Sequence, residues 1–143
     1  MSVLLWPRKK RPQQPQASAR LAHYTALGYE FFAPGVLVSE TLYVLCKKLE
    51  AGTLTLATHA QAITDFHTLL SFIQPPPNGE ISLALRAEAI RGNYTCRRSA
   101  DGFYIALAEE LNASRPTVLL TFDEDMAKQA ARNAPSVMVE LLT

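Results

Sequence analysis

The sequence has little cysteine, no long apolar run and almost no net charge. Its 143 residues contain two cysteines, which provide neither a disulfide framework nor the C-x-x-C spacing of a metal or redox site. No stretch approaches the roughly 18 apolar residues of a membrane-spanning helix, and the first residues place their charges after the apolar ones, the reverse of a signal peptide. The net charge of +1 leaves any attraction to nucleic acid to local patches. These features predict a single cytoplasmic domain over residues 1–143.

Several kinds of catalytic site are also missing from the sequence. Its three histidines, His23, His59 and His67, lie far apart and form no H-x-x-E or H-E-x-x-H pattern, so we expect no histidine-based metal site. Neither a Gly-x-Gly-x-x-Gly sequence nor a P-loop is present, which argues against a nucleotide cofactor. Ser39 and Cys46 have no base at a recognisable spacing, which argues against nucleophilic catalysis.

Apolar stretches of strand length alternate with segments of helical periodicity along the chain. The continuous apolar run at 117–122 is typical of an inner parallel strand, and the run at 2–6 is a strand or the end of one. Further strands are expected at 29–33 and 136–142, and helices at 17–28, 35–52, 58–73, 80–92, 101–112 and 123–133. Prolines and basic residues predict a flexible loop at 7–16. Strands that alternate with helices predict an α/β fold with a mainly parallel sheet.

Three carboxylates stand where an apolar core would not place them. Glu40 is the one charge in an apolar helical stretch, and Asp101 is in line with the apolar stripe that continues at Tyr104 and Leu111. Asp123 directly follows the apolar strand at 117–122, and ligand sites of open α/β sheets lie at the carboxyl ends of strands. Carboxylates from separate segments repel one another unless a cation joins them, and oxygen ligands favour Mg²⁺ or Mn²⁺. Such an ion can polarise a phosphodiester and activate water.

Each of these acids also has a simpler interpretation. Asp123 can cap the helix that follows it, since Asp is a favoured N-cap residue. Asp101 can be a first-turn residue that the helix dipole favours, with Ser99 as the cap. Glu40 can bond a nearby lysine, arginine or backbone amide. These interpretations weaken when the three acids are considered together.

The order and spacing of three segments resemble a PIN domain, the fold of the VapC toxins of bacterial toxin–antitoxin pairs. Residues 31–52 resemble the family's strand, Ala-Pro and helix that carries its second acid, which maps to Glu40. Residues 99–112 resemble the helix with the third acid, which maps to Asp101, although Gly102 replaces the usual alanine. Residues 118–130 resemble the strand-to-helix turn with the fourth acid, which maps to Asp123 with Thr121 beside it.

This resemblance implies a fold, a function and a set of partners. The expected fold is a three-layer α/β/α arrangement with helices on both sides of the sheet. The expected function is that of a metal-dependent endoribonuclease, in which Glu40, Asp101 and Asp123 hold Mg²⁺ or Mn²⁺ and Thr121 contributes a hydroxyl near the ion. The expected partners are an RNA substrate, a cognate antitoxin protein and a second copy of the chain.

The resemblance fails at the start of the chain. The family opens with a central strand that ends in Asp, and here Ser2, Val3 and Leu4 match only the residues after that acid. The first acid would fall before Met1, and we expect that the chosen start codon lies too late in the reading frame. The alternative is a catalytically inactive PIN-like module that only binds RNA or protein. A third alternative is an unrelated α/β domain whose acids are caps and surface pairs.

Two groups of basic residues could contact a nucleic-acid backbone. Arg97 and Arg98 stand just before Asp101, which places them near the expected acidic site. Four basic residues at 8–11 lie in the expected flexible loop, where they are usually solvated.

Overall fold

A five-stranded parallel sheet forms the centre of the molecule in the computed structural model, which describes residues 2–5, 14–92 and 94–142. The strand order is β3-β2-β1-β4-β5, so β1 is the central strand and pairs with β2 and β4. The strands are β1 (Ser2–Leu5), β2 (Glu30–Phe32), β3 (Ile73–Gln74), β4 (Thr117–Thr121) and β5 (Met138–Leu141). All four pairings are parallel, which confirms the predicted sheet.

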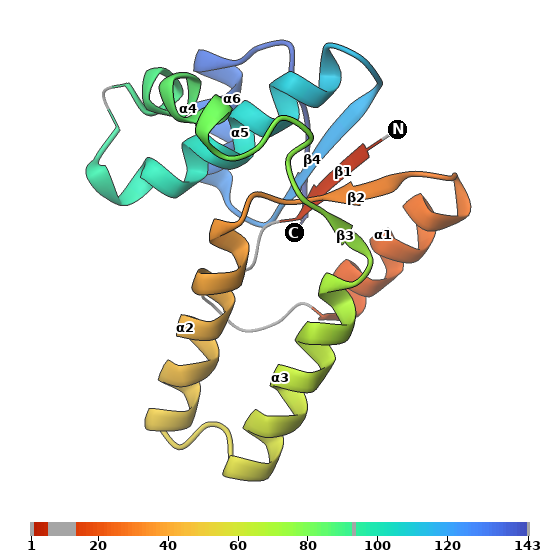
Figure 1. The fold of residues 1–143 in the computed structure, drawn as a ribbon, viewed down its shortest axis with the longest axis vertical. Helices are drawn as coiled ribbons and strands as arrows, with labels where there is room; N and C mark the ends of the chain where they lie inside the picture. Colours follow the sequence, from red (N-terminus) through yellow and green to blue (C-terminus); the bar gives the residue numbers. More distant parts are fainter. Residues whose placement is uncertain (1, 6–13, 93, 143) are drawn as a thin grey trace.

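Helices lie on both sides of this sheet, as Figure 1 shows. The helices are α1 (Gln14–Ala26), α2 (Val36–Glu50), α3 (Leu56–Leu70), α4 (Ala84–Arg91), α5 (Ser99–Asn112) and α6 (Glu124–Asn133), with short 3₁₀ turns η1 (Ile81–Leu83) and η2 (Cys96–Arg98). Helices α4, α5 and α6 gather on one side, while α1 lies on the other. The α/β/α arrangement expected from the sequence is confirmed.

The core is divided by the sheet into two apolar clusters. Side chains alternate along β4, so Leu119 joins the larger cluster with α4, α5 and α6, whereas Val118 and Leu120 join a smaller one with Tyr24 of α1. Every residue of β4 is buried. Burial on both faces explains why this strand reads as a continuous apolar run rather than an alternating one.

Helices α2 and α3 form a hairpin that extends away from the sheet (Figure 1). The hairpin turns at Gly52, whose φ of +74° suits glycine. Thr55 then caps α3, because its hydroxyl accepts a hydrogen bond from the Thr58 amide while the Thr58 hydroxyl accepts one from the Thr55 amide. Leu37 is the buried residue of α2, and α3 has none. The hairpin therefore adds little to the core.

Three sequence predictions need correction. Helix α1 starts at Gln14, inside the segment expected to be a loop, because Pro15 stands in the first turn, where its missing N–H breaks no helix hydrogen bond. Residues 7–13 of that loop lie outside the described residues. The helix expected at 58–73 ends at Leu70, and its last residues turn into β3, a two-residue strand that pairs with β2. The strand predicted at 2–6 is confirmed, because Ser2–Leu5 form the central strand, whereas the alignment of Ser2, Val3 and Leu4 with the residues after that strand is wrong.

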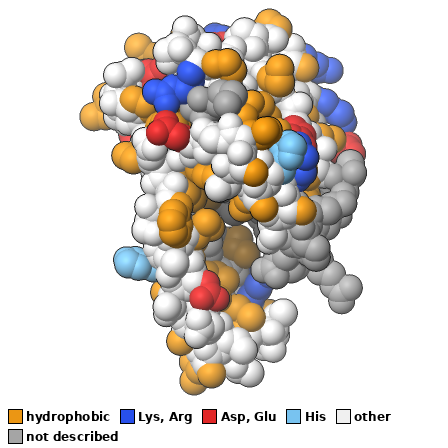
Figure 2. Space-filling view, turned by 90° about the vertical axis from the view of Figure 1, so that its right-hand side faces the viewer, with side chains coloured by type: hydrophobic (Ala, Val, Ile, Leu, Met, Phe, Trp, Pro, Cys, Tyr) orange, Lys and Arg blue, Asp and Glu red, His pale blue; other side chains and the backbone are white. Residues whose placement is uncertain are grey.

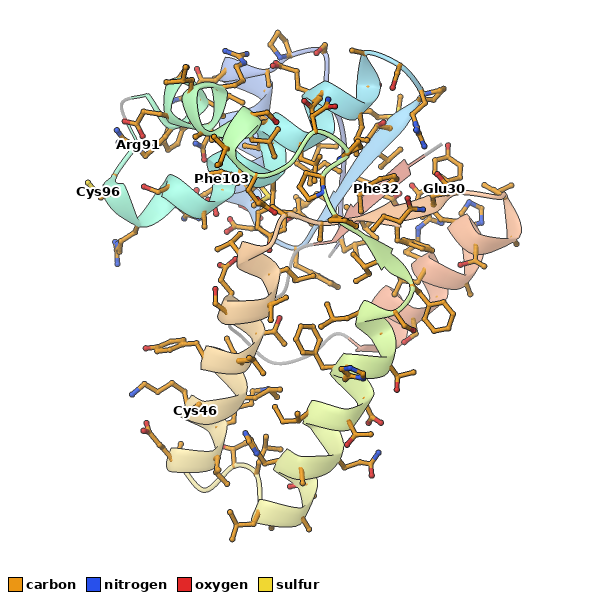
Figure 3. All side chains as sticks on the ribbon, viewed as in Figure 1. Glu30, Phe32, Cys46, Arg91, Cys96 and Phe103 are labelled. Carbon is orange, nitrogen blue, oxygen red and sulfur yellow. The ribbon has the colours of Figure 1, made fainter. Side chains whose placement is uncertain are left out.

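Two further features of the described residues bear on the chemistry. Cys46 and Cys96 are free and exposed and lie well apart (Figure 3), so they form no disulfide. No helix in the described ranges is long and apolar enough to span a bilayer.

Candidate functional site

Asp123 lies between β4 and α6 as the N-cap residue of α6, and its two carboxylate oxygens have different partners. Oδ1 accepts hydrogen bonds from the backbone amides of Asp125 at 2.8 Å and Met126 at 3.3 Å, so the predicted N-cap role is confirmed. The Asp123 amide donates to the Thr121 hydroxyl at 3.0 Å, which fixes the turn. Oδ2 is left to face the space between α6 and α5.

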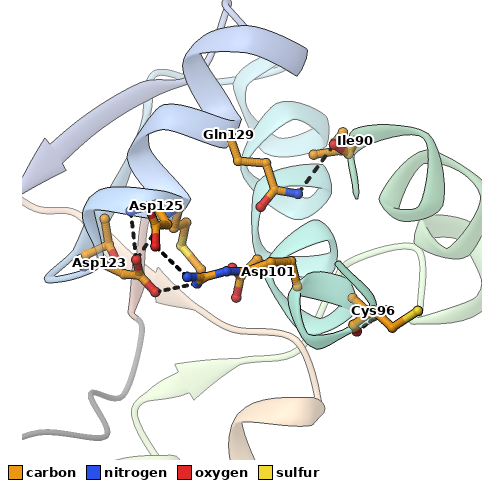
Figure 4. Close-up of polar contacts among 10 residues, drawn as sticks. Ile90, Cys96, Asp101, Asp123, Asp125 and Gln129 are labelled. Carbon is orange, nitrogen blue, oxygen red and sulfur yellow. Dashed lines mark hydrogen bonds and ion pairs between the residues drawn. The ribbon is translucent and has the colours of Figure 1, made fainter. Parts of the chain in front are cut away.

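Arg98 joins three aspartates in that space (Figure 4). Its Nη1 lies 3.0 Å from Asp101 Oδ2 and 2.9 Å from Asp123 Oδ2, and its Nη2 lies 2.6 Å from Asp125 Oδ2. Partial burial opposes the charge of Arg98, but the hydrogen bonds to Asp101 and Asp123 outweigh it and raise the pKa of the guanidinium. The structure thus brings two of the predicted acids together around one positive charge.

Asp101 owes its position to the burial of α5. The helix packs Tyr104, Ile105, Ala108 and Leu111 into the core, and Asp101 in the first turn is in line with them and only 2% exposed. A carboxylate in such a place needs a positive partner or strong donors, because water cannot solvate it. Arg98 supplies this positive partner.

Glu40 reaches the same helix through Tyr104. The Tyr104 hydroxyl donates to Glu40 Oε1 at 3.2 Å, and the tyrosine is fully buried. Burial first, and then the negative charges of Glu40 and Asp101, raise the pKa of the Tyr104 hydroxyl. Because both carboxylates act on one hydroxyl, Glu40 lies on the side of α5 that carries Asp101.

The structure tests the simpler interpretation of each acid, and the result differs from one acid to the next. Asp123 does cap α6, yet its second oxygen remains in the cluster, so both roles coexist. Ser99 is not the cap of α5: the helix starts at Ser99 itself, and the serine hydroxyl donates to the Cys96 carbonyl oxygen at 2.8 Å. For Glu40, the Tyr104 hydroxyl is one hydrogen-bond donor within the described residues.

The carboxylate oxygens of Asp101 and Asp123 supply some, but not all, of the ligands that a hard divalent ion needs. The Oδ2 atoms of Asp101 and Asp123 approach a single nitrogen atom of Arg98, so two carboxylate oxygens can share one cationic centre. Within the described ranges, no three His, Cys, Asp or Glu side chains form a group that could hold a metal ion. Asp101 and Asp123 thus fit as two carboxylate ligands of Mg²⁺ or Mn²⁺, while the described contact of Glu40 is with the Tyr104 hydroxyl.

Sequence reasoning missed two residues of this site. Asp125 contacts Arg98, and the Asp-Glu-Asp sequence at the end of β4 could have indicated a second carboxylate there. The sequence places Tyr104 in the apolar stripe of its helix, and its role as a donor to Glu40 was not predicted, although a buried tyrosine hydroxyl usually finds a hydrogen-bond partner. Arg98 was expected to contact nucleic acid, and the structure gives it aspartate partners, whereas Arg97 is exposed.

Close packing of two helices explains why glycine occupies position 102. A Cβ atom at this position would lie 2.4 Å from the carbonyl oxygen of Ala87, so α4 and α5 approach too closely here for alanine. The departure from the family's usual alanine is thus matched by a close helix contact beside Asp101.

The central strand brings no acid to the site in the described residues. Leu5, the last residue of β1, pairs with Leu120 of β4, so the two strands end side by side. The sequence continues with Trp6 and contains no Asp or Glu before Glu30. The acids of the site therefore come from α2, α5, the turn between β4 and α6, and the first turn of α6.

Comparison with known proteins identifies the family. A search of curated proteins finds no match. The family model described as PIN domain matches residues 2–132, which includes Glu40, Asp101 and Asp123. This match excludes the alternative of an unrelated α/β domain. With its parallel sheet, flanking helices and acids at the carboxyl end of β4, the chain belongs to the PIN domain family.

Proposed function

We propose that this PIN domain is a metal-dependent endoribonuclease of the VapC toxin type. The observation that carries the proposal is the approach of Asp101 and Asp123 to one cationic nitrogen at the carboxyl end of β4. Two carboxylates that share a cation in a partly buried site suit binding of Mg²⁺ or Mn²⁺. The family supports the reaction class, because PIN domains form a superfamily of nucleases that bind RNA and generally use divalent metal ions.

Each residue has a distinct role under this proposal. A bound divalent ion supplies the charge that polarises the scissile phosphodiester and activates water. Asp101 and Asp123 hold the ion, and Glu40 adds negative charge from α2. The Thr121 hydroxyl accepts the Asp123 amide hydrogen and so orients the turn that carries this acid. Arg97, exposed at the edge of the site, contacts the RNA backbone together with Arg98.

The proposal is tested by cleavage of an end-labelled single-stranded RNA with Mn²⁺ or Mg²⁺. Asp101→Asn and Glu40→Gln are expected to lower the cleavage rate by roughly 10²-fold or more, since even residues behind metal ligands are worth 10–100-fold. Asp65→Asn is the matched control, because Asp65 is an exposed acid on α3 whose carboxylate accepts a hydrogen bond from the Gln61 side chain. Normal cleavage by both site variants would show that the acids are not the nuclease site.

A catalytically inactive module that only binds RNA or protein is the second candidate. Two observations favour it: the Arg98 guanidinium already neutralises Asp101 and Asp123, and the sequence has no acid before Glu30. This candidate predicts that the wild-type chain shifts a labelled RNA in a gel without cutting it in Mn²⁺ or Mg²⁺. Cleavage that depends on Asp101 excludes it.

A second copy of the chain and an antitoxin protein are the proposed protein partners. Large apolar side chains on the α2–α3 hairpin are exposed, among them Leu42, Tyr43 and Leu56, and suit a dimer contact. A mostly apolar pocket of about 370 Å³ between α1, β2 and α3, lined by Leu21, Phe31 and Phe72 among others, suits an apolar side chain of an antitoxin. Figure 2 shows hydrophobic side chains spread over this side of the molecule. With RNA as substrate, we propose a cytoplasmic location.

A further inference from the structure

Arg98 stands where a divalent ion would have to bind under the proposed function. Its Nη1 atom lies within 3.0 Å of Asp101 Oδ2 and 2.9 Å of Asp123 Oδ2. A Mg²⁺ ligand oxygen lies about 2.0–2.1 Å from the ion. The same two oxygens cannot serve an ion at that distance while a guanidinium stays between them, because the two positive charges would repel each other.

We propose that Arg98 is an internal counter-ion that a divalent metal must displace. This inference rests on the proposed function, since it concerns the same two carboxylates. Without metal, Arg98 pairs with Asp101, whose side chain is only 3% exposed and therefore depends on protein groups rather than water for its stabilisation. With metal, the ion takes over that neutralisation.

The geometry gives the guanidinium a way out of the site. The Arg98 side chain is 28% exposed, and its Nη2 bonds Asp125, whose side chain is 56% exposed. Arg98 can therefore move toward the solvent side of the cluster and keep a carboxylate partner there. Released from Asp101 and Asp123, its planar fork of donors is free to bond a phosphate of the substrate in two places.

The test is a calorimetric Mn²⁺ titration of four full-length proteins at one ionic strength: wild type, Arg98→Gln, Arg98→Lys and Arg97→Gln. Arg98→Gln is expected to bind Mn²⁺ about tenfold more tightly than wild type. Arg98→Lys keeps the charge but lacks the fork, so its affinity is expected between the two, and it serves if the glutamine variant does not fold. Arg97→Gln removes an equal charge one residue away and is expected to bind Mn²⁺ within about twofold of wild type.

Thermal unfolding gives a second measurement that does not depend on cleavage. Metal-free Arg98→Gln is expected to unfold at a lower temperature than wild type, because Asp101 and Asp123 lose their shared partner. Saturating Mn²⁺ is expected to raise its unfolding temperature more than that of wild type. Equal or weaker Mn²⁺ affinity in both Arg98 variants, or an equal gain in Arg97→Gln, would overturn the inference.

The Mn²⁺ titration and the RNA cleavage assay test the two proposals independently. Mn²⁺-dependent RNA cleavage, combined with unchanged Mn²⁺ affinity in the Arg98 variants, overturns displacement and leaves the nuclease proposal in place. The expected order of affinities without any cleavage supports displacement and overturns the nuclease proposal. Absence of Mn²⁺ binding in all four proteins overturns both.

Discussion

Tyr104 is the residue that ties Glu40 to the rest of the site. Its hydroxyl is buried, lies beside Glu40 and Asp101, and has a raised pKa. A raised pKa in the folded state means that folding favours the protonated tyrosine. That contribution to stability is fully present below the unfolded pKa of about 10 and is lost as the pH rises above it, through the folded pKa.

Tyr104→Phe is therefore expected to change how stability depends on pH. Above about pH 10 the free energy of unfolding of wild type should fall by about 1.4 kcal/mol per pH unit more steeply than that of Tyr104→Phe. Urea unfolding at pH 8, 10 and 11 measures the difference. Tyr43→Phe on the exposed face of α2 is the control and should follow wild type. Parallel pH profiles for wild type and Tyr104→Phe would contradict the burial of a protonated hydroxyl.

Asp123 has two tasks that different substitutions separate. Asn caps a helix about as well as Asp, whereas Ala costs about 1 kcal/mol at this position. We expect Asp123→Ala to be less stable than Asp123→Asn by about that amount, since only Asn keeps an acceptor for the α6 amides. Both variants lose the negative charge toward Arg98, so both should lose Mn²⁺ affinity. Chemical unfolding and Mn²⁺ titration measure the two effects, and equal stability would argue against the cap.

Two of the acids that meet at Arg98, Asp101 and Asp123, were predictable from the sequence, but the third acid, Asp125, and the arginine between them were not. Asp123 follows an apolar strand and Asp101 interrupts an apolar stripe, and such misplaced charges are visible in the sequence alone. Which atoms face them depends on the crossing of α5, α6 and η2, which local periodicity does not encode. Arg98 thus looked like a surface charge, although it lies between Asp101 and Asp123.

At the scale of secondary-structure elements, helices α4 and α5 approach each other closely at Gly102. Gly102 allows their backbones to meet, since an added Cβ would lie 2.4 Å from the Ala87 carbonyl oxygen. We expect Gly102→Ala to destabilise the protein by about 1–3 kcal/mol, the usual cost of overpacking. Because Asp101 precedes Gly102, a shift of α5 should also weaken Mn²⁺ binding. Urea unfolding and Mn²⁺ titration check the two effects.

Gly35→Ala is the matched control for this substitution. An added Cβ at Gly35 would lie 3.1 Å from Glu80 Oε1, which accepts a hydrogen bond from the Gly35 amide at the end of a flexible side chain and needs to shift only slightly, and the φ of −60° suits alanine. We therefore expect a change in stability within about 0.5 kcal/mol. A loss as large as that of Gly102→Ala would indicate that close backbone contact is not the cause.

Most of the elements were predictable because their periodicity and end signals agree. The strand β4 and helices α2, α5 and α6 match their predicted ranges within a few residues. Prediction failed where a signal was too short or ambiguous. The two residues of β3 cannot display a strand period, and Pro15 was interpreted as a helix breaker although the first turn tolerates proline.

At the scale of the whole molecule, the α2–α3 hairpin is an apolar projection from a well-packed body. Leu56 on it is 78% exposed, and Leu42 and Tyr43 are also accessible. If this surface joins two copies, Leu42→Glu should place charges in the contact and shift the protein from dimer to monomer. Light scattering during size-exclusion chromatography measures the mass. Ser18→Glu, which adds the same charge on exposed α1, should remain a dimer. A monomeric wild type, or a dimeric Leu42→Glu, would contradict the proposed contact.

The pairing of β1 with β4 also determines when the site can form during synthesis. Ser2 lies opposite Thr117, so the central ladder joins residues more than a hundred positions apart in the chain. A ribosome exposes the chain from its N-terminus, and contacts this distant in sequence close late. The turn that holds Asp123 comes directly after β4, so it is made later still. A nascent chain therefore has no assembled acidic site until nearly all of it has been translated.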